Sequence, residues 1–175
     1  MARAKLSGWS SSERVSPVGA VQFEQLVTSS RPLVEHSEAG ALALAGSYWN
    51  EVEITTRRLV RARGRNGGIA LLLFGRFALL RFGAPETAVD ETGVLSRFSI
   101  TGGLLARTPG GSITFSQSAM PAVELRATVD GFFPRLGGRP GGPAWTGALY
   151  RHVQQRIHTS ISRRYFQRLI GEEPR

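Results

Sequence analysis

The chain has 175 residues, of which 41% are hydrophobic and 20% are charged, and this composition suits a single globular domain with its own core. It contains no cysteine, which excludes disulfides and thiolate metal sites. The formal net charge is +9, and 21 of the 22 basic residues are arginine. This excess indicates either forked contacts to phosphate and carboxylate groups or the compositional bias of an Ala- and Gly-rich chain.

The first 30 residues predict a tail followed by a helix. Residues 1–15 are polar and serine-rich, so we expect a mobile tail, and they lack the apolar segment of a signal peptide. Ser16-Pro17 is typical of a helix start, which predicts an amphipathic helix to about Ser30. Residues 38–45 are compatible with either one more helix or a loop.

A hairpin is expected in the middle of the chain. Apolar and charged residues alternate from Glu51 to Arg63, which predicts a strand. The Asn66-Gly67 pair that follows is a strong signal for a two-residue hairpin, so residues 69–82 are expected to return as the second strand. Two arginines interrupt this apolar run, which argues against a membrane span.

The hairpin turn fixes the pairing of the two strands. Val60 would face Leu73 and Arg58 would face Gly75 on the apolar side, whereas Arg57 would face Arg76 on the charged side. Like charges across a ladder are destabilising, so we expect a bulge, an acid or a bound anion between the last two side chains.

The rest of the chain predicts more strands and a final helix. Strands are expected over residues 84–89, 94–101, 112–117 and 123–129, with a short continuation over 104–107, which gives about six antiparallel strands. A Gly/Pro connector at 137–143 precedes a helix from about residue 144 to 170.

These elements predict an α+β fold in one domain spanning residues 16–171. A single curved antiparallel meander of about six strands would pack against a long C-terminal helix and a shorter N-terminal helix. The order of elements resembles the helix-grip ligand-binding domains of the polyketide-cyclase and lipid-transfer kind, and the resemblance implies a small apolar ligand. A calycin-like barrel followed by a helix is the alternative.

The leading functional hypothesis is a non-enzymatic domain that binds a small apolar or lipid-like ligand with an acidic head group in a sheet–helix cavity. Arg58 would bind the head group, and the cavity would be lined by Leu73, Phe77, Leu79, Phe98, Ile100 and Phe115. A filled core with Arg58 reaching solvent is the alternative. No cofactor or metal site is predicted, and a cytoplasmic location needs the fewest assumptions.

A second hypothesis concerns the C-terminal region, because residues 131–171 contain seven arginines and no acid. Its helix would contact an anionic membrane, nucleic acid or an acidic protein through Arg151, Arg156, Arg163, Arg164 and Arg168. A packed helix with an arginine-rich outer face explains the same pattern. A third hypothesis is an enzyme that uses Glu51 or Glu53 as a base, although solvated ion pairs account for these acids as well.

Overall fold

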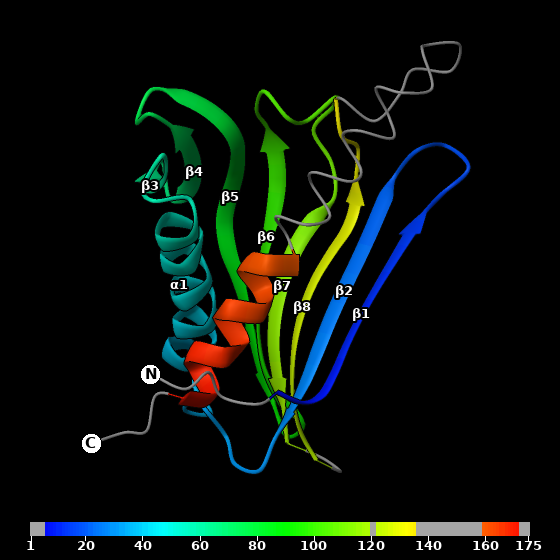
Figure 1. Cartoon of the computed structure of the whole chain (residues 1–175), viewed down its shortest axis with the longest axis vertical. Helices are drawn as coiled ribbons and strands as arrows, with labels where there is room; N and C mark the ends of the chain where they lie inside the picture. Colours follow the sequence, from blue (N-terminus) through cyan, green and yellow to red (C-terminus); the bar gives the residue numbers. More distant parts are fainter. Residues whose placement is uncertain (1–5, 120–121, 136–158, 172–175) are drawn as a thin grey trace.

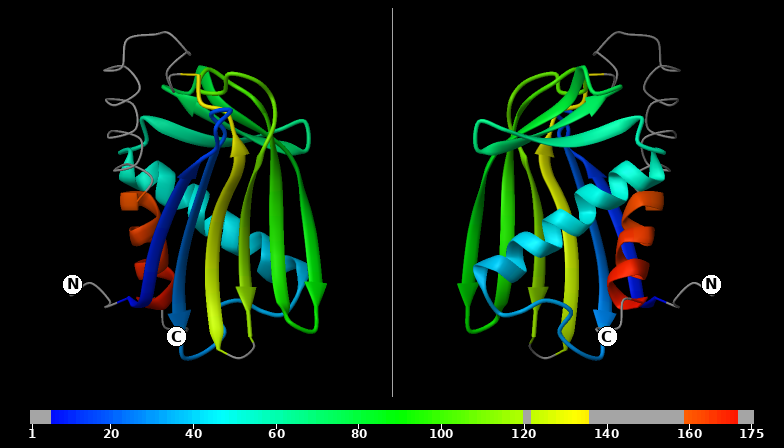
Figure 2. Two further views of the ribbon diagram at one scale, coloured as in Figure 1. Left: turned by 90° about the vertical axis from the view of Figure 1, so that its right-hand side faces the viewer. Right: turned by 90° about the vertical axis from the view of Figure 1, so that its left-hand side faces the viewer.

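A computed structural model describes residues 6–119, 122–135 and 159–171. It contains an eight-stranded antiparallel sheet in the order β1-β2-β8-β7-β6-β5-β4-β3. The strands are β1 (Ser7–Val15), β2 (Val21–Ser29), β3 (Val60–Arg65), β4 (Gly68–Leu73), β5 (Phe77–Asp90), β6 (Gly93–Gly102), β7 (Ser112–Ser118) and β8 (Val123–Phe132). Helix α1 (Glu38–Thr55) and a second helix over residues 159–171 lie on the same side of this sheet (Figures 1 and 2). The expected α+β fold is therefore confirmed, with eight strands in place of about six.

The two additional strands come from the N-terminal region. Phe23, Gln25 and Val27 are buried while the residues between them are more exposed, and this period of two makes β2 a strand. β2 pairs with β8, which joins the β1–β2 hairpin to the meander of β3 to β8. The predicted helix to about Ser30 is wrong, because Ser16 begins a turn in which its Oγ accepts a hydrogen bond from the backbone N–H of Ala20 at 3.0 Å. The predicted mobile tail is wrong over residues 7–15, which form β1.

Helix α1 replaces the loop or short helix expected near residue 38 and the start of the strand expected at Glu51. Its buried face follows helical spacing and consists of Ala41, Leu44, Ala45, Tyr48, Trp49 and Val52. The Ser37 side chain caps the helix by accepting a hydrogen bond from the N–H of Gly40 at 3.1 Å. This helix therefore continues through residues that alternate in sequence like a strand.

The helix ends in two nested hydrogen bonds. The N–H of Arg58 donates to the carbonyl of Glu53 at 2.6 Å, and the N–H of Arg57 donates to that of Ile54 at 3.0 Å. This is the Schellman arrangement, in which the residue after the cap has left-handed backbone. Arg57 and Arg58 have φ angles of 52° and 61°, so two arginines occupy backbone conformations that glycine would adopt more easily.

The hairpin prediction is confirmed for β3 and β4. The register runs from Val60 opposite Leu73 to Arg65 opposite Gly68, with Asn66 and Gly67 at positive φ. The pairing of Arg58 with Gly75 and of Arg57 with Arg76 is wrong, because both arginines lie in the turn after α1. The expected like-charge conflict therefore does not arise.

In the rest of the sheet, the strands begin and end at other residues than predicted. The run over 69–82 is divided by a turn at residues 74–76 into β4 and β5, and β5 absorbs the edge strand expected at 84–89. The continuation expected over 104–107 is a turn with one isolated bridge between Ala106 and Pro134. The connector at 137–143 and the start of the expected C-terminal helix lie outside the described residues.

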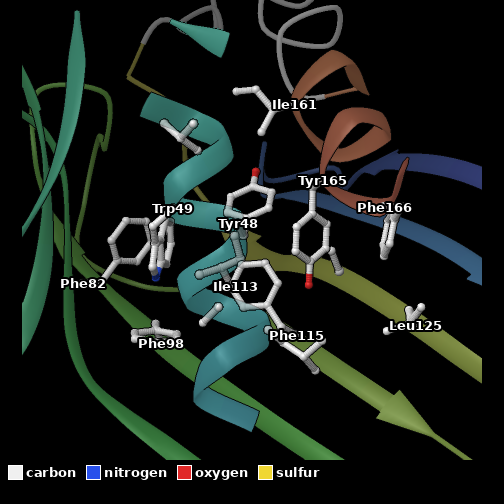
Figure 3. Packing of buried hydrophobic residues seen from close by; sticks show 14 of the residues in the cluster. Tyr48, Trp49, Phe82, Phe98, Ile113, Phe115, Leu125, Ile161, Tyr165 and Phe166 are labelled. Carbon is white, nitrogen blue, oxygen red and sulfur yellow. The ribbon is translucent and has the colours of Figure 1, made fainter. Parts of the chain in front are cut away.

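Aromatic side chains from both helices and the sheet meet in the core (Figure 3). α1 contributes Tyr48 and Trp49, the sheet contributes Phe82, Phe98 and Phe115, and the last helix contributes Tyr165 and Phe166. Their ring centroids are 4.8–6.5 Å apart, mostly in edge-on or tilted contacts. In the part of the chain that the structure describes, no helix is long and apolar enough to cross a membrane.

Candidate functional site

The structure brings three of the predicted lining residues together on the concave face of the sheet. Phe98, Ile100 and Phe115 are buried and belong to the core cluster. The Trp49 ring lies 5.6 Å from Phe98, and the Tyr48 ring lies 4.8 Å from Phe115 (Figure 3). Side chains of α1 therefore cover the surface that these residues were expected to offer to a ligand.

The other predicted ligand residues lie elsewhere. Leu73 and Leu79 are half-buried, and Phe77 is exposed at the start of β5. Arg58 is exposed in the turn after α1 and does not face the concave side from a strand, so its assignment to the head group of an interior ligand is wrong. The cause is local, since the Schellman turn takes Arg58 out of the β3 ladder.

A row of residues across four strands places polar groups in this interior. Gln25 on β2 pairs with Ala127 on β8, Ala127 pairs with Phe115 on β7, and Phe115 pairs with Ser96 on β6. Gln25 and Ser96 are fully buried at the two ends of this row. At about 4.8 Å per strand, three strand steps separate them by about 14 Å.

These polar side chains have no hydrogen-bond partners among the described residues. Both side-chain atoms of Gln25, the hydroxyl of Ser96 and the indole nitrogen of Trp49 are buried and unpaired. Trp49 contacts Phe98, which lies two residues from Ser96 on the same face of β6. Leaving such a group buried without a partner costs about 1–3 kcal/mol, so three of them on one interior surface identify a candidate site.

Gln117 shows what a satisfied polar group on the same face looks like. Its Oε1 accepts hydrogen bonds from the backbone N–H groups of Leu33 and Val34 at 2.7 and 3.2 Å. Its Nε2 donates to the carbonyl of Val34 at 3.0 Å. Gln117 therefore holds the segment before α1 against the sheet, and it is not part of the candidate site.

Polar contacts also join α1 to the last helix. The Glu51 carboxylate is 2% exposed, accepts a hydrogen bond from Thr55 Oγ1 at 3.1 Å and lies 3.2 Å from Nε of Arg168. The Arg168 contact is an ion pair without hydrogen-bond alignment, because Glu51 Oε2 has no hydrogen-bond partner. Nearby, burial raises the pKa of Tyr48 to about 12, and a hydrogen bond with Ser162 opposes part of this shift.

Glu51 and Glu53, which were the candidate bases of an enzyme, do not form a pair of carboxylates in the structure. Glu51 and Glu53 lie on α1, where residues two apart point in different directions. Glu53 accepts a hydrogen bond from the N–H of Ala62 at 2.8 Å and forms an ion pair with Arg63 at 3.2 Å. Each carboxylate thus has a separate structural role.

Only part of the predicted basic surface can be placed. Arg163 and Arg164 are exposed on the last helix, whereas Arg168 is paired with Glu51. Arg151 and Arg156 lie outside the described residues. The opposite face of this helix carries Ile161, Tyr165, Phe166 and Leu169, which are buried in the core.

Comparison with known proteins leaves the family open. No family model matches the chain, and no curated protein matches it. The crystal structure of Ara h 8.0201 is similar at a TM-score of 0.36 and 16% sequence identity, over 85% of this chain and 99% of that one.

Proposed function

We propose that the protein is a non-enzymatic binding domain for a small, largely apolar ligand that carries hydrogen-bonding groups. The observation that supports this proposal is the set of buried, unpaired polar atoms of Gln25, Ser96 and Trp49 on the concave side of the sheet. A ligand that paired with these atoms would remove their desolvation penalty, and its apolar part would lie among the aromatic rings.

The proposed site has two ends. Ser96 lies on the part of the sheet beneath α1, next to Phe115 and Phe98, whose rings contact Tyr48 and Trp49. Gln25 lies on β2, next to the β1 strand whose Trp9 ring is 5.8 Å from Phe166 of the last helix. The ligand would therefore lie between the sheet and the two helices, and binding would shift the helices relative to the sheet.

The chemistry of the two ends limits the ligand. A glutamine side chain donates and accepts, a serine hydroxyl does both, and an indole N–H only donates. These groups are neutral, so they suit hydroxyl, carbonyl or protonated carboxyl groups better than a charged head. The acidic head group expected from Arg58 is not part of this proposal.

The test uses the full chain and an apolar fluorescent probe with a neutral hydrogen-bonding end, Nile red. Native mass spectrometry of the gently purified protein is expected to show a co-purified small molecule, and the probe is expected to displace it. Gln25→Leu with Ser96→Ala should weaken probe binding about tenfold while leaving stability equal or higher, because two unpaired polar groups are removed. The matched control is Ser116→Ala, since Ser116 lies between two inward residues and faces the other side of β7.

Two results would overturn the proposal. One is the absence of both a co-purified molecule and saturable probe binding. The other is unchanged probe affinity in the double variant, which would mean that the polar row does not contact the probe.

A further inference from the structure

Three residues with large, exposed apolar side chains lie in the segments beyond the C-terminal end of α1 and beside β3 and β4. Figure 1 shows these segments at one corner of the sheet. Phe74 is 67% exposed, Phe77 is 51% and Leu59 is 50%. The N–H of Phe74 donates to the carbonyl of Leu59 at 2.7 Å, which joins the turn after α1 to the β4–β5 turn. We call this surface the basic–aromatic corner; it consists of Arg57, Arg58, Leu59, Phe74, Arg76 and Phe77.

The backbone at this corner adopts conformations that its side chains disfavour. Phe74 has a φ of 53° in a tight turn closed by a 3.1 Å hydrogen bond from the N–H of Arg76 to the carbonyl of Leu73. Of the four non-glycine residues with positive φ among those described, three lie at this corner: Arg57, Arg58 and Phe74. The fourth is Asn66, a residue type that tolerates this region. Such strain at an exposed aromatic residue points to a role outside folding.

The chain segment that carries the exposed apolar side chains has charge of one sign only. Residues 54–85 contain seven arginines and no acid. Arg57, Arg58 and Arg76 are exposed, and none of them forms an ion pair within the described part of the chain. The guanidinium of Arg76 lies 5.8 Å from the centre of the Phe77 ring. The corner therefore combines a protruding apolar tip with unpaired positive charge.

We propose that the basic–aromatic corner docks onto an anionic lipid bilayer. Phe74, Phe77 and Leu59 would enter the interface, and the arginines would bind the phosphates of the head groups. A second copy of this chain is disfavoured as the occupant, because the same unpaired positive charge would repel it. Nucleic acid is the alternative partner, because Phe74 and Phe77 could stack on bases, but the exposed aliphatic Leu59 between the arginines suits a bilayer better. This proposal concerns the outer surface and does not depend on an interior ligand.

The test is sedimentation of the full chain with vesicles of phosphatidylcholine alone or mixed with phosphatidylserine. Binding is expected only to the mixed vesicles, and it should weaken as salt is added. Phe74→Asn should reduce the partition coefficient about tenfold because it removes a large apolar side chain. Arg57→Gln with Arg58→Gln should reduce it by about fivefold for each arginine.

Phe74→Asn also separates docking from folding. Asn-Gly is the preferred pair for a tight turn with two positive φ angles, so this variant should be at least as stable as the wild type while binding vesicles less. Val18→Asn is the matched control, because Val18 is 70% exposed in the β1–β2 turn and should not affect vesicle binding.

Three results would overturn the proposal. The first is no sedimentation with the mixed vesicles, and the second is wild-type binding by Phe74→Asn. The third is that Arg163→Gln/Arg164→Gln loses vesicle binding while the corner variants bind like the wild type, which would assign binding to the last helix. Retention on duplex DNA that depends on the corner arginines but not on Phe74 would identify nucleic acid as the partner and would likewise refute bilayer docking.

Discussion

Replacing Arg168 with alanine tests whether the last helix is held on α1 by charge as well as by apolar contacts. The substitution removes the guanidinium that lies 3.2 Å from Glu51. The remaining carboxylate is 2% exposed and keeps only the hydroxyl of Thr55 as a hydrogen-bond partner among the described residues. The free energy of unfolding should therefore fall.

The expected size follows from the burial of the two partners. Removing one partner of a fully buried ion pair costs about 3–5 kcal/mol. The Arg168 side chain is 40% exposed, so water screens this pair, and we expect a loss of about 2 kcal/mol. Glu51→Gln removes the buried charge itself and should cost less than Arg168→Ala.

Urea denaturation of the wild type, both single variants and the double variant gives the coupling between the two side chains. The double variant should be less destabilised than the sum of the single variants by about 1 kcal/mol or more. Arg164→Ala is the control, because Arg164 is exposed on the same helix and should change stability by less than about 0.5 kcal/mol. A coupling near zero would refute the reasoning, since it would show that water solvates Glu51 as well as Arg168 does.

Four other single substitutions give further predictions. Gly46→Ala should raise the free energy of unfolding by about 0.5–1 kcal/mol, because the new methyl group on α1 meets nothing within 4 Å. Gly40→Ala should lower it, because the methyl group would overlap the carbonyl of Glu35; equal effects of the two variants in urea melts would contradict this. The folded-state pKa of Tyr48 is about 12 against an ordinary 10.0, so its contribution to stability is complete below pH 10 and is lost as the pH rises from 10 towards 12. Urea midpoints between pH 9 and about 12 should therefore fall less steeply in Tyr48→Phe than in the wild type. Gln117→Leu should lower the free energy of unfolding by about 2 kcal/mol and speed hydrogen exchange at the amides of Leu33 and Val34. Unchanged exchange at these amides would show that Gln117 does not hold the segment before α1 against the sheet.

The β3–β4 hairpin shows what sequence alone can predict here. A two-residue type I′ turn requires positive φ at two successive residues, and Asn-Gly accepts these angles more readily than most pairs. The turn therefore set the register, and the pairs Val60–Leu73 and Ala62–Leu71 follow from it without knowledge of the rest of the fold. The alternation of apolar and polar residues also predicted β6, β7 and β8, because each of these strands buries mainly one face.

Helix α1 was missed because two patterns compete in its sequence. Residues 51–63 alternate as in a strand, and the left-handed position after the helix cap is occupied by Arg57, where glycine is the usual signal. The deciding pattern was the spacing of Ala41, Leu44, Ala45, Tyr48, Trp49 and Val52, which fits only a helix. That spacing could have been found in the sequence, whereas the unusual helix end could not.

The candidate site was predicted in part. Phe98, Ile100 and Phe115 follow from strand alternation, and their burial is confirmed. Gln25 and Ser96 were missed, because a polar residue at an inward position stands out only once the strand and its face are known. Their alignment across four strands depends on the β2–β8 pairing, which joins residues about a hundred positions apart and leaves no local signal.

The pairing of β2 with β8 also decides which strands form the borders of the sheet. One border is β1, whose sequence SGWSSSERV is mostly polar, and the other is the six-residue β3, which carries Arg61, Arg63 and Arg65. The carboxylate of Glu53 already occupies the N–H of Ala62 on that second border. Short, charged or polar borders are poor templates for a strand from another molecule, so this architecture disfavours edge-to-edge aggregation.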